Sequence, residues 1–218
     1  KFRGWVNKEI AGSYPNLPNI HNITEIAEEI KNSLIGDPAS NRILPRKHYE
    51  SVVLFVVDGL GRWLYECTKE DEAFKTIRRE LETRIVSETN VSSVIPTTTG
   101  VAHISLLVGK GPCEHGIISD ILYINDEIVC VIPPTGKEKI EKSRPMHPRD
   151  VSGDSLLQVL REAGVESYVV SYVGADKNCY LGGWLQRDVG KDKYIAEKNE
   201  ERISHQLQRI LTQSSIKG

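Results

Sequence analysis

The apolar and polar positions change period along the chain and predict alternating strands and helices. Residues 52–57 are apolar without alternation and mostly β-branched, which is typical of a central strand over 51–57 buried on both faces. Apolar residues recur at helical spacing over 23–34, with Asn22 and Glu25 placed as an N-terminal capping box and Gly36 as the stop. This alternation predicts an α/β fold with a doubly wound, mainly parallel sheet and helices on both faces.

The rest of the chain continues this pattern. The predicted elements are a helix over 61–84, a strand near 84–94, a short helix over 100–108, a hairpin of 121–124 and 127–132, a loop over 133–152, a helix over 154–163 capped by Asp154, a strand over 166–173 and a helix over 195–213. We expect an insertion or cap region at about 120–190.

Composition narrows the class of protein. The 218 residues carry 28 basic and 30 acidic side chains, a formal charge of −2, which argues against binding of a nucleic-acid duplex. No apolar stretch approaches the roughly 20 residues needed to span a bilayer. The four cysteines are far apart and are expected to be buried free thiols. The sequence shows no signal peptide, so we expect a cytoplasmic location, with secretion as the alternative if such a peptide has been removed.

Asp58 follows the predicted strand directly, and Gly59 and Gly61 follow Asp58. Ligands of open α/β sheets bind beyond the carboxyl ends of the strands, so Asp58 is a candidate metal ligand. A dinucleotide-binding turn is disfavoured because Leu64 replaces its third glycine, and a phosphoaspartyl enzyme is disfavoured because Leu60 replaces its second aspartate. The simplest alternative is an aspartate that caps the following helix.

Thr99 precedes the predicted helix that begins with Gly100. A helix N-terminus offers free N–H groups and a partial positive charge, so it is suited to hold a phosphoryl group. A threonine hydroxyl becomes a nucleophile when a divalent cation lowers its pKa, and Asp58 is a suitable companion ligand for that cation. The alternative is a polar turn in which a threonine caps the helix.

These residues resemble a known family. The block Val53-x-x-Val56-x-Asp58-Gly59 is followed by a gapless stretch from Pro96 to Ile117 that contains Pro96-Thr97-x-Thr99, His103, Ser105-Leu106, Gly109, Pro112 and His115-Gly116-Ile117. Over residues 50–120 the chain is similar to the type I phosphodiesterase/nucleotide pyrophosphatase family of the alkaline phosphatase superfamily.

The resemblance implies a two-zinc phosphoester hydrolase acting on a small phosphoester or nucleotide-like substrate. It identifies Asp58 as a metal ligand, and Thr99 as both a metal ligand and the nucleophile that forms a phosphothreonyl intermediate. The Gly100 amide would bind phosphate, and Asp120 takes the phosphate-binding position where many relatives have asparagine. His103 and His115 are interpreted as packing or hydrogen-bonding residues rather than zinc ligands.

The later zinc ligands of the family have no counterpart in this sequence. An Asp-x-x-x-His, an Asp-His pair and a final histidine are missing, and the late histidine, His205, lies in a predicted helix. We therefore expect residues 1–218 to be the N-terminal portion of one alkaline phosphatase-like catalytic domain, truncated at its C-terminus, which associates with the missing portion or with itself. Two functions stay open: a metal-dependent phosphodiesterase, or a catalytically incomplete module that binds phosphate or a partner. A Rossmann dehydrogenase is a third and weaker alternative.

Overall fold

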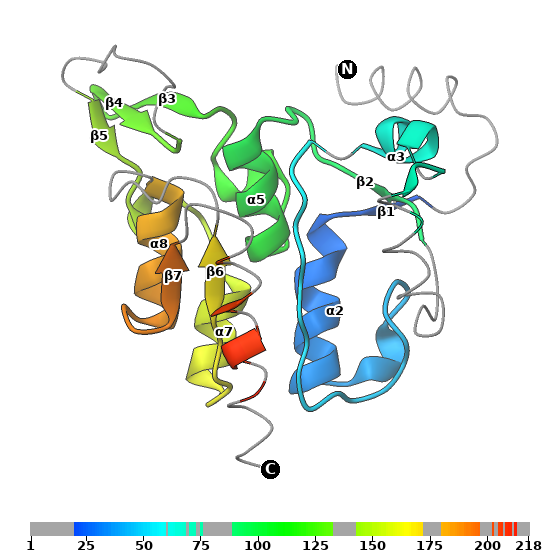
Figure 1. The fold of residues 1–218 in the computed structure, drawn as a ribbon. Helices are drawn as coiled ribbons and strands as arrows, with labels where there is room; N and C mark the ends of the chain where they lie inside the picture. Colours follow the sequence, from blue (N-terminus) through cyan, green and yellow to red (C-terminus); the bar gives the residue numbers. More distant parts are fainter. Residues whose placement is uncertain are drawn as a thin grey trace.

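The computed structural model describes residues 20–59, 61–68, 70–72, 75, 89–132, 143–171 and 180–196, together with positions between 202 and 212 with gaps. Figure 1 shows the elements. The helices are α2 (Thr24–Leu34), α3 (Arg62–Thr68), α5 (Thr99–Val108), α6 (Pro112–His115), α7 (Leu156–Glu162) and α8 (Tyr180–Val189). The strands are β1 (His21–Asn22), β2 (Val91–Ser92), β3 (Ile121–Ile124), β4 (Glu127–Cys130), β5 (Ser143–Pro145), β6 (Val169–Ser171) and β7 (Tyr194–Ala196).

The strands pair in three small sheets within the described residues. β1 pairs with β2 and β6 pairs with β7, both in parallel, while β3, β4 and β5 form a mixed sheet whose first pair is the predicted hairpin. Asn125 and Asp126 make the hairpin turn with φ of 50° and 64°, the left-handed values that a tight two-residue turn requires. The chain thus has α/β content, and a single doubly wound sheet stays a prediction.

The segment 51–57 is not the buried strand that its apolar residues predicted. It runs extended without joining any of the three sheets of the described residues, and Phe55 and Val57 are 70% and 64% exposed. Val52 alone packs partly against a core cluster. An apolar run indicates a segment that favours burial as a strand. A central strand also needs neighbouring strands on both sides to hydrogen-bond with it, and a local sequence pattern does not show where those neighbours lie.

Helix α5 lies at the centre of the larger core cluster. Val101 and Ile104 are fully buried. They pack in one cluster with Val129 of the hairpin, Ile117 of the segment that follows α6, and Trp184 of α8. Gly109 ends the helix with a left-handed φ of 70°, which a glycine adopts without strain. The core therefore fixes the position and direction of α5, and its N-terminus with them.

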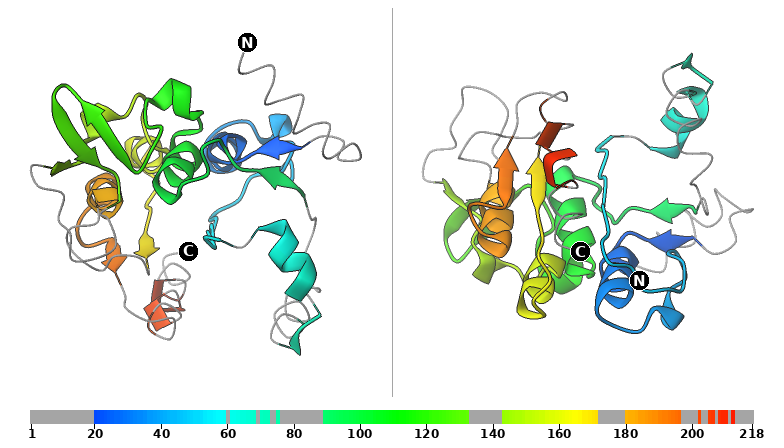
Figure 2. Two further views of the ribbon diagram at one scale, coloured as in Figure 1. Left: turned by 90° about the horizontal axis from the view of Figure 1, so that it is seen from above. Right: turned by 60° about the horizontal axis from the view of Figure 1, so that its bottom comes forward.

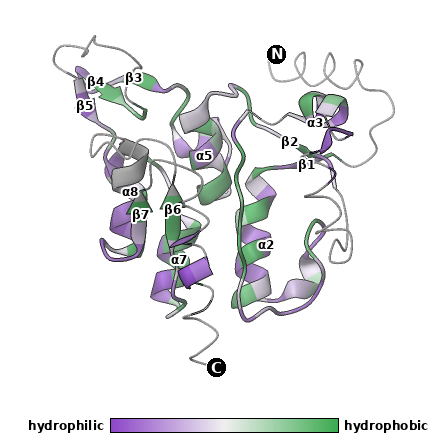
Figure 3. Ribbon diagram, in the orientation of Figure 1, coloured by the Kyte–Doolittle hydropathy of each residue, from purple (hydrophilic) through white to green (hydrophobic). Residues whose placement is uncertain are grey.

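Helix α2 packs against α5 and α7 and carries the second cluster. The Asn22 backbone amide donates to Glu25, which is one of the two bonds of the predicted capping box. The Asn22 side chain accepts from Thr24 instead of the Glu25 amide, and the N-cap by backbone geometry is Ile23. Figure 3 shows apolar and polar bands alternating along this helix, as its spacing requires.

A buried acid, Glu29, stands on helix α2 and is 5% exposed. Its carboxylate accepts hydrogen bonds from the backbone amides of residues 42–44 at 2.6 to 3.0 Å. These bonds fasten the loop that leads into segment 51–57.

Several predicted boundaries are wrong. Ser155, not Asp154, caps α7 by accepting a hydrogen bond from the Gln158 amide. Residues 194–196 form β7 instead of beginning a helix, and α8 and β5 were not predicted at all. In the predicted helix over 61–84, α3 ends at Thr68, and positions 72 and 75 are again helical among the residues described beyond it. Trp63, expected to face inward, is 77% exposed.

Helix α3 stands away from the other helices in both views of Figure 2. The predicted elements that fall on residues 76–88, 133–142 and 172–179 lie outside the described residues, as does Cys179. The other three cysteines are free thiols as predicted, but Cys67 and Cys113 are exposed rather than buried. Among the described helices, none combines the length and apolar character needed to cross a membrane.

Candidate active site

Asp58 lies in a tight turn at the end of the extended segment 51–57. Gly59 follows it with a φ of 76°, a backbone conformation that glycine reaches without the clash of a Cβ. The turn directs the chain away toward α3 and leaves the Asp58 carboxylate at the end of the segment. This is the position predicted for a metal-ligating aspartate, although the segment that carries it is exposed.

Thr99 is the first residue of α5, and its side chain meets Asp58. The Thr99 hydroxyl donates a hydrogen bond of 3.0 Å to Asp58 Oδ2, across 41 residues of sequence. The predicted ligand and the predicted nucleophile are therefore in direct contact. Thr98, the residue before Thr99, is the N-cap by its backbone geometry, but its side chain makes no capping hydrogen bond. Its buried hydroxyl has no hydrogen-bonding partner in the described part of the chain.

Gly100 places an amide of the first turn of α5 beside Asp120. The Gly100 N–H donates to Asp120 Oδ1 at 2.9 Å. A Cβ at position 100 would lie 2.6 Å from Asp120 Oδ1 and 2.6 Å from Val131 Cγ1. The close approach of the hairpin to the helix thus requires a residue without a side chain.

The base of the hairpin brings Asp120 to this helix. Asp120 directly precedes β3 and Val131 directly follows β4, and the Val131 amide donates to the Asp120 carbonyl at 2.8 Å. All four residues predicted for the site, Asp58, Thr99, Gly100 and Asp120, meet at the N-terminus of α5. No arginine or lysine of the described residues forms an ion pair with either carboxylate.

The two histidines near the site make hydrogen bonds within the fold, as predicted. His115 is fully buried; its Nδ1 accepts from the Ile117 amide, so its Nε2 carries the hydrogen that faces Ser105 Oγ at 2.8 Å. Burial lowers the pKa of His115 and favours this neutral form. His103 Nδ1 lies 2.7 Å from the Thr99 carbonyl, which can only accept, so this nitrogen is the donor.

The site offers two oxygen ligands to a divalent cation. The Asp58 carboxylate and the Thr99 hydroxyl are hard donors in direct contact, which fits part of the ligand set of such a cation. Zinc sites usually have about four ligands in a tetrahedral array. Within the described residues, no group of three or more histidine, cysteine, aspartate or glutamate side chains comes together. Zinc itself therefore stays a prediction.

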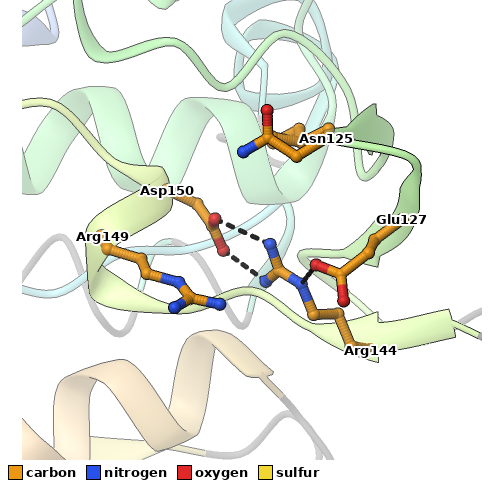
Figure 4. Close-up of a pocket in the computed structure, with 6 residues that line it drawn as sticks. Asn125, Glu127, Arg144, Arg149 and Asp150 are labelled. Atoms are coloured by element: carbon orange, nitrogen blue, oxygen red, sulfur yellow. Dashed lines mark hydrogen bonds and ion pairs between the residues drawn. The ribbon is translucent and has the colours of Figure 1, made fainter.

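A concave region lies at the tip of the hairpin, where no sequence motif predicted a site (Figure 4). It encloses about 450 Å³ and is lined by Ile124, Asn125, Glu127, Arg144, Arg149 and Asp150. Arg144 bonds both oxygens of Asp150, at 2.6 and 2.9 Å, and Glu127 at 2.6 Å. The hydrogen bond from Arg144 lowers the pKa of Asp150, so the acid stays ionised. These contacts tie the hairpin to residues 144–150.

The ion pairs at this cavity form between residues that no sequence pattern brings together. Arg144 and Asp150 stand in a stretch that the sequence predicts as a loop, and neither belongs to a motif. The pairing of Arg144 with Glu127 depends on β5 joining β4, which is a long-range event. Arg144 bridges two carboxylates, Glu127 and Asp150, and these internal ion pairs hold the walls of the cavity together.

Comparison with known proteins gives one result. The family model of type I phosphodiesterase / nucleotide pyrophosphatase matches residues 52–215. No curated protein and no solved structure matched the chain. The matched region contains Asp58, Thr99, Gly100 and Asp120.

Proposed function

The chain belongs to the type I phosphodiesterase/nucleotide pyrophosphatase family, and we propose that its site at the N-terminus of α5 hydrolyses phosphoesters with Thr99 as the nucleophile. Family membership supports a hydrolase of this type and a small phosphoester or nucleotide as the substrate. The observation that carries the proposal is the hydrogen bond from Thr99 Oγ to Asp58. The family also implies an alkaline phosphatase-like fold.

In the proposed reaction, Thr99 Oγ attacks phosphorus as its proton passes to the Asp58 carboxylate. The bond from phosphorus to the leaving oxygen breaks, and that oxygen takes a proton from solvent water as it departs. The partial positive charge at the N-terminus of α5 stabilises the negative charge on the phosphoryl oxygens, and the Gly100 amide joins it where a phosphoryl oxygen replaces Asp120 as its acceptor. Water then hydrolyses the phosphothreonine and restores the hydroxyl. A divalent cation held by Asp58 and Thr99, zinc in our proposal, would supply positive charge that lowers the pKa of the hydroxyl.

The test is removal of the hydroxyl. Thr99→Ala should lower kcat for bis(4-nitrophenyl) phosphate by at least about a thousandfold, as loss of a nucleophile does in other hydrolases. Thr99→Ser, which keeps a hydroxyl, should recover part of the rate, and mass spectrometry of acid-quenched enzyme should find a 4-nitrophenyl phosphoryl group on residue 99. Thr97→Ala, a change two residues away at an exposed position, is the matched control. Full turnover by Thr99→Ala refutes the proposed nucleophile.

A second candidate function is suggested by the short ligand set. If Asp58 and Thr99 are the only ligands available, the chain binds phosphate or a partner and does not turn substrate over. Metal content distinguishes the two functions, because a complete site should retain two zinc ions per chain and the incomplete one should retain at most one, weakly. Zinc-dependent turnover by the 218-residue chain would rule out the binding-only function.

A further inference from the structure

Asp120 puts a negative charge where the proposed site receives phosphate. Its Oδ1 accepts from the Gly100 amide at 2.9 Å, and Thr99 is the adjacent residue. The carboxylate therefore occupies the same N–H group that a phosphoryl oxygen would use. The space above Gly100 is filled by Asp120 and Val131, since a Cβ there would contact both at 2.6 Å.

Two carboxylates flank this amide. Asp58 lies on one side, against Thr99, and Asp120 on the other, against Gly100. The described residues place no lysine or arginine in an ion pair with either of them. The positive end of a helix is equivalent to about half a charge, and a divalent cation held by Asp58 and Thr99 would add positive charge on the Thr99 side. The contribution of Asp120 is therefore the change that follows when its own charge alone is removed.

Phosphoesters differ in the charge that they bring to such a site. A phosphodiester carries one negative charge, whereas a phosphomonoester carries close to two at neutral pH because its second pKa is near 6. Each additional charge is repelled by a carboxylate a few ångströms away, and the half-buried position of Asp120 weakens the screening by water. The monoester is therefore penalised more than the diester.

We infer that Asp120 is a specificity-determining residue that makes the site discriminate against dianionic phosphomonoesters in favour of monoanionic diesters. This inference rests on the proposed function. Asp120 acts through its charge and not as a reacting group. Its hydrogen bond to Gly100 also places this charge next to Thr99, where the reacting phosphorus would lie.

The substitution Asp120→Asn isolates the charge. An asparagine oxygen still accepts from the Gly100 amide, so the contact and the hairpin base are kept. Asp126→Asn is the matched control, because it removes the same charge from the same hairpin at an exposed turn. Asparagine adopts the left-handed φ of 64° found there without difficulty.

The experiment compares kcat/KM for bis(4-nitrophenyl) phosphate and 4-nitrophenyl phosphate in the full chain and both variants. In Asp120→Asn the preference for the diester should fall by at least about tenfold, mainly through a gain with the monoester. In Asp126→Asn the preference should stay within about twofold, because an exposed distant charge is screened. An unchanged preference in Asp120→Asn, or equal changes in both variants, overturns the inference.

A binding measurement keeps the inference testable if the chain turns over neither ester. Phosphorus NMR titrations would follow inorganic phosphate, a dianion at pH 8, and dimethyl phosphate, a monoanion. Asp120→Asn should bind phosphate at least about tenfold more tightly than wild type while dimethyl phosphate changes much less. No gain with either anion, or the same gain with both, overturns the charge filter. Persistent hydrolysis by Thr99→Ala would instead overturn the proposed nucleophile and leave this comparison valid.

Discussion

Gly100→Ala tests whether the hairpin really closes on helix α5 as described. The new Cβ would lie 2.6 Å from both Asp120 Oδ1 and Val131 Cγ1, and 3.2 Å from Val131 Cβ. Both contacts are closer than atoms of these types approach, and Val131 is fully buried in the core. Either the hairpin base or the first turn of α5 has to move.

The magnitude follows from two opposing effects. Overpacking in a filled core costs about 1–3 kcal/mol, and two contacts of this length favour the upper part of that range. Alanine in a helix contributes about 0.5–1 kcal/mol relative to glycine. The free energy of unfolding should therefore fall by about 1–2 kcal/mol, and Tm by about 2–8 °C for a domain of this size.

The assay is urea unfolding, with thermal unfolding as a second measurement. Gly61→Ala is the control, because a Cβ there meets no atom within 4 Å and the backbone is not left-handed; its stability should be unchanged or slightly higher. If Gly100→Ala is as stable as wild type while Gly61→Ala behaves as expected, the hairpin does not pack on Gly100 and the contact of Asp120 with the helix is wrong.

Two further outcomes follow from buried groups. Glu29→Gln should lower the free energy of unfolding by about 2–3 kcal/mol in urea titrations, because a charged acceptor of three backbone amides is lost. The control Glu28→Gln, on the exposed face, should change it by less than about 0.5 kcal/mol. Equal losses in the two variants would contradict the role of the buried Glu29 carboxylate. Because the folded pKa of His115 is depressed, the unfolded chain binds a proton that the folded chain refuses, so stability should fall as pH drops below about 6.5 and this dependence should weaken in His115→Gln. A free energy of unfolding of the wild type that rises as the pH drops below about 6.5 would contradict the buried neutral histidine.

The parts of the site that local chemistry determines could be predicted from the sequence. Thr99 and Gly100 open a helix because a polar turn precedes a run of helical spacing, and Asp58 ends an extended segment because two glycines follow it. The hairpin turn follows from Asn125 and Asp126, which tolerate left-handed backbone. Local patterns do not show that Asp58, Thr99 and Gly100 meet the base of the hairpin at one place. The family resemblance implied that they do.

The elements that were missed depend on distant partners or on unfavourable local propensity. Residues 194–196 look helical beside the residues that follow, but they pair with β6, and that pairing outweighs local preference. Helix α8 contains Gly182 and Gly183, which lower helix propensity by about 1 kcal/mol each, so the pattern concealed it. The hydrogen bond of Asp120 to Gly100 required the hairpin to fold back over the helix, and no local rule predicts that.

The antiparallel pairing of β3 with β4 limits how this part of the chain can change length. Ile121 pairs with Cys130 and Ile124 with Glu127, so the residues flanking the hairpin, Asp120 and Val131, reach α5 together. Side chains alternate between the two faces of a strand, and a slip of one residue turns each of them to the opposite face. A single inserted residue would therefore aim Asp120 away from the helix unless a bulge absorbed it. Insertions of two residues at the turn would lengthen the hairpin outward and leave its base aligned, so natural or designed variants should differ here in even steps.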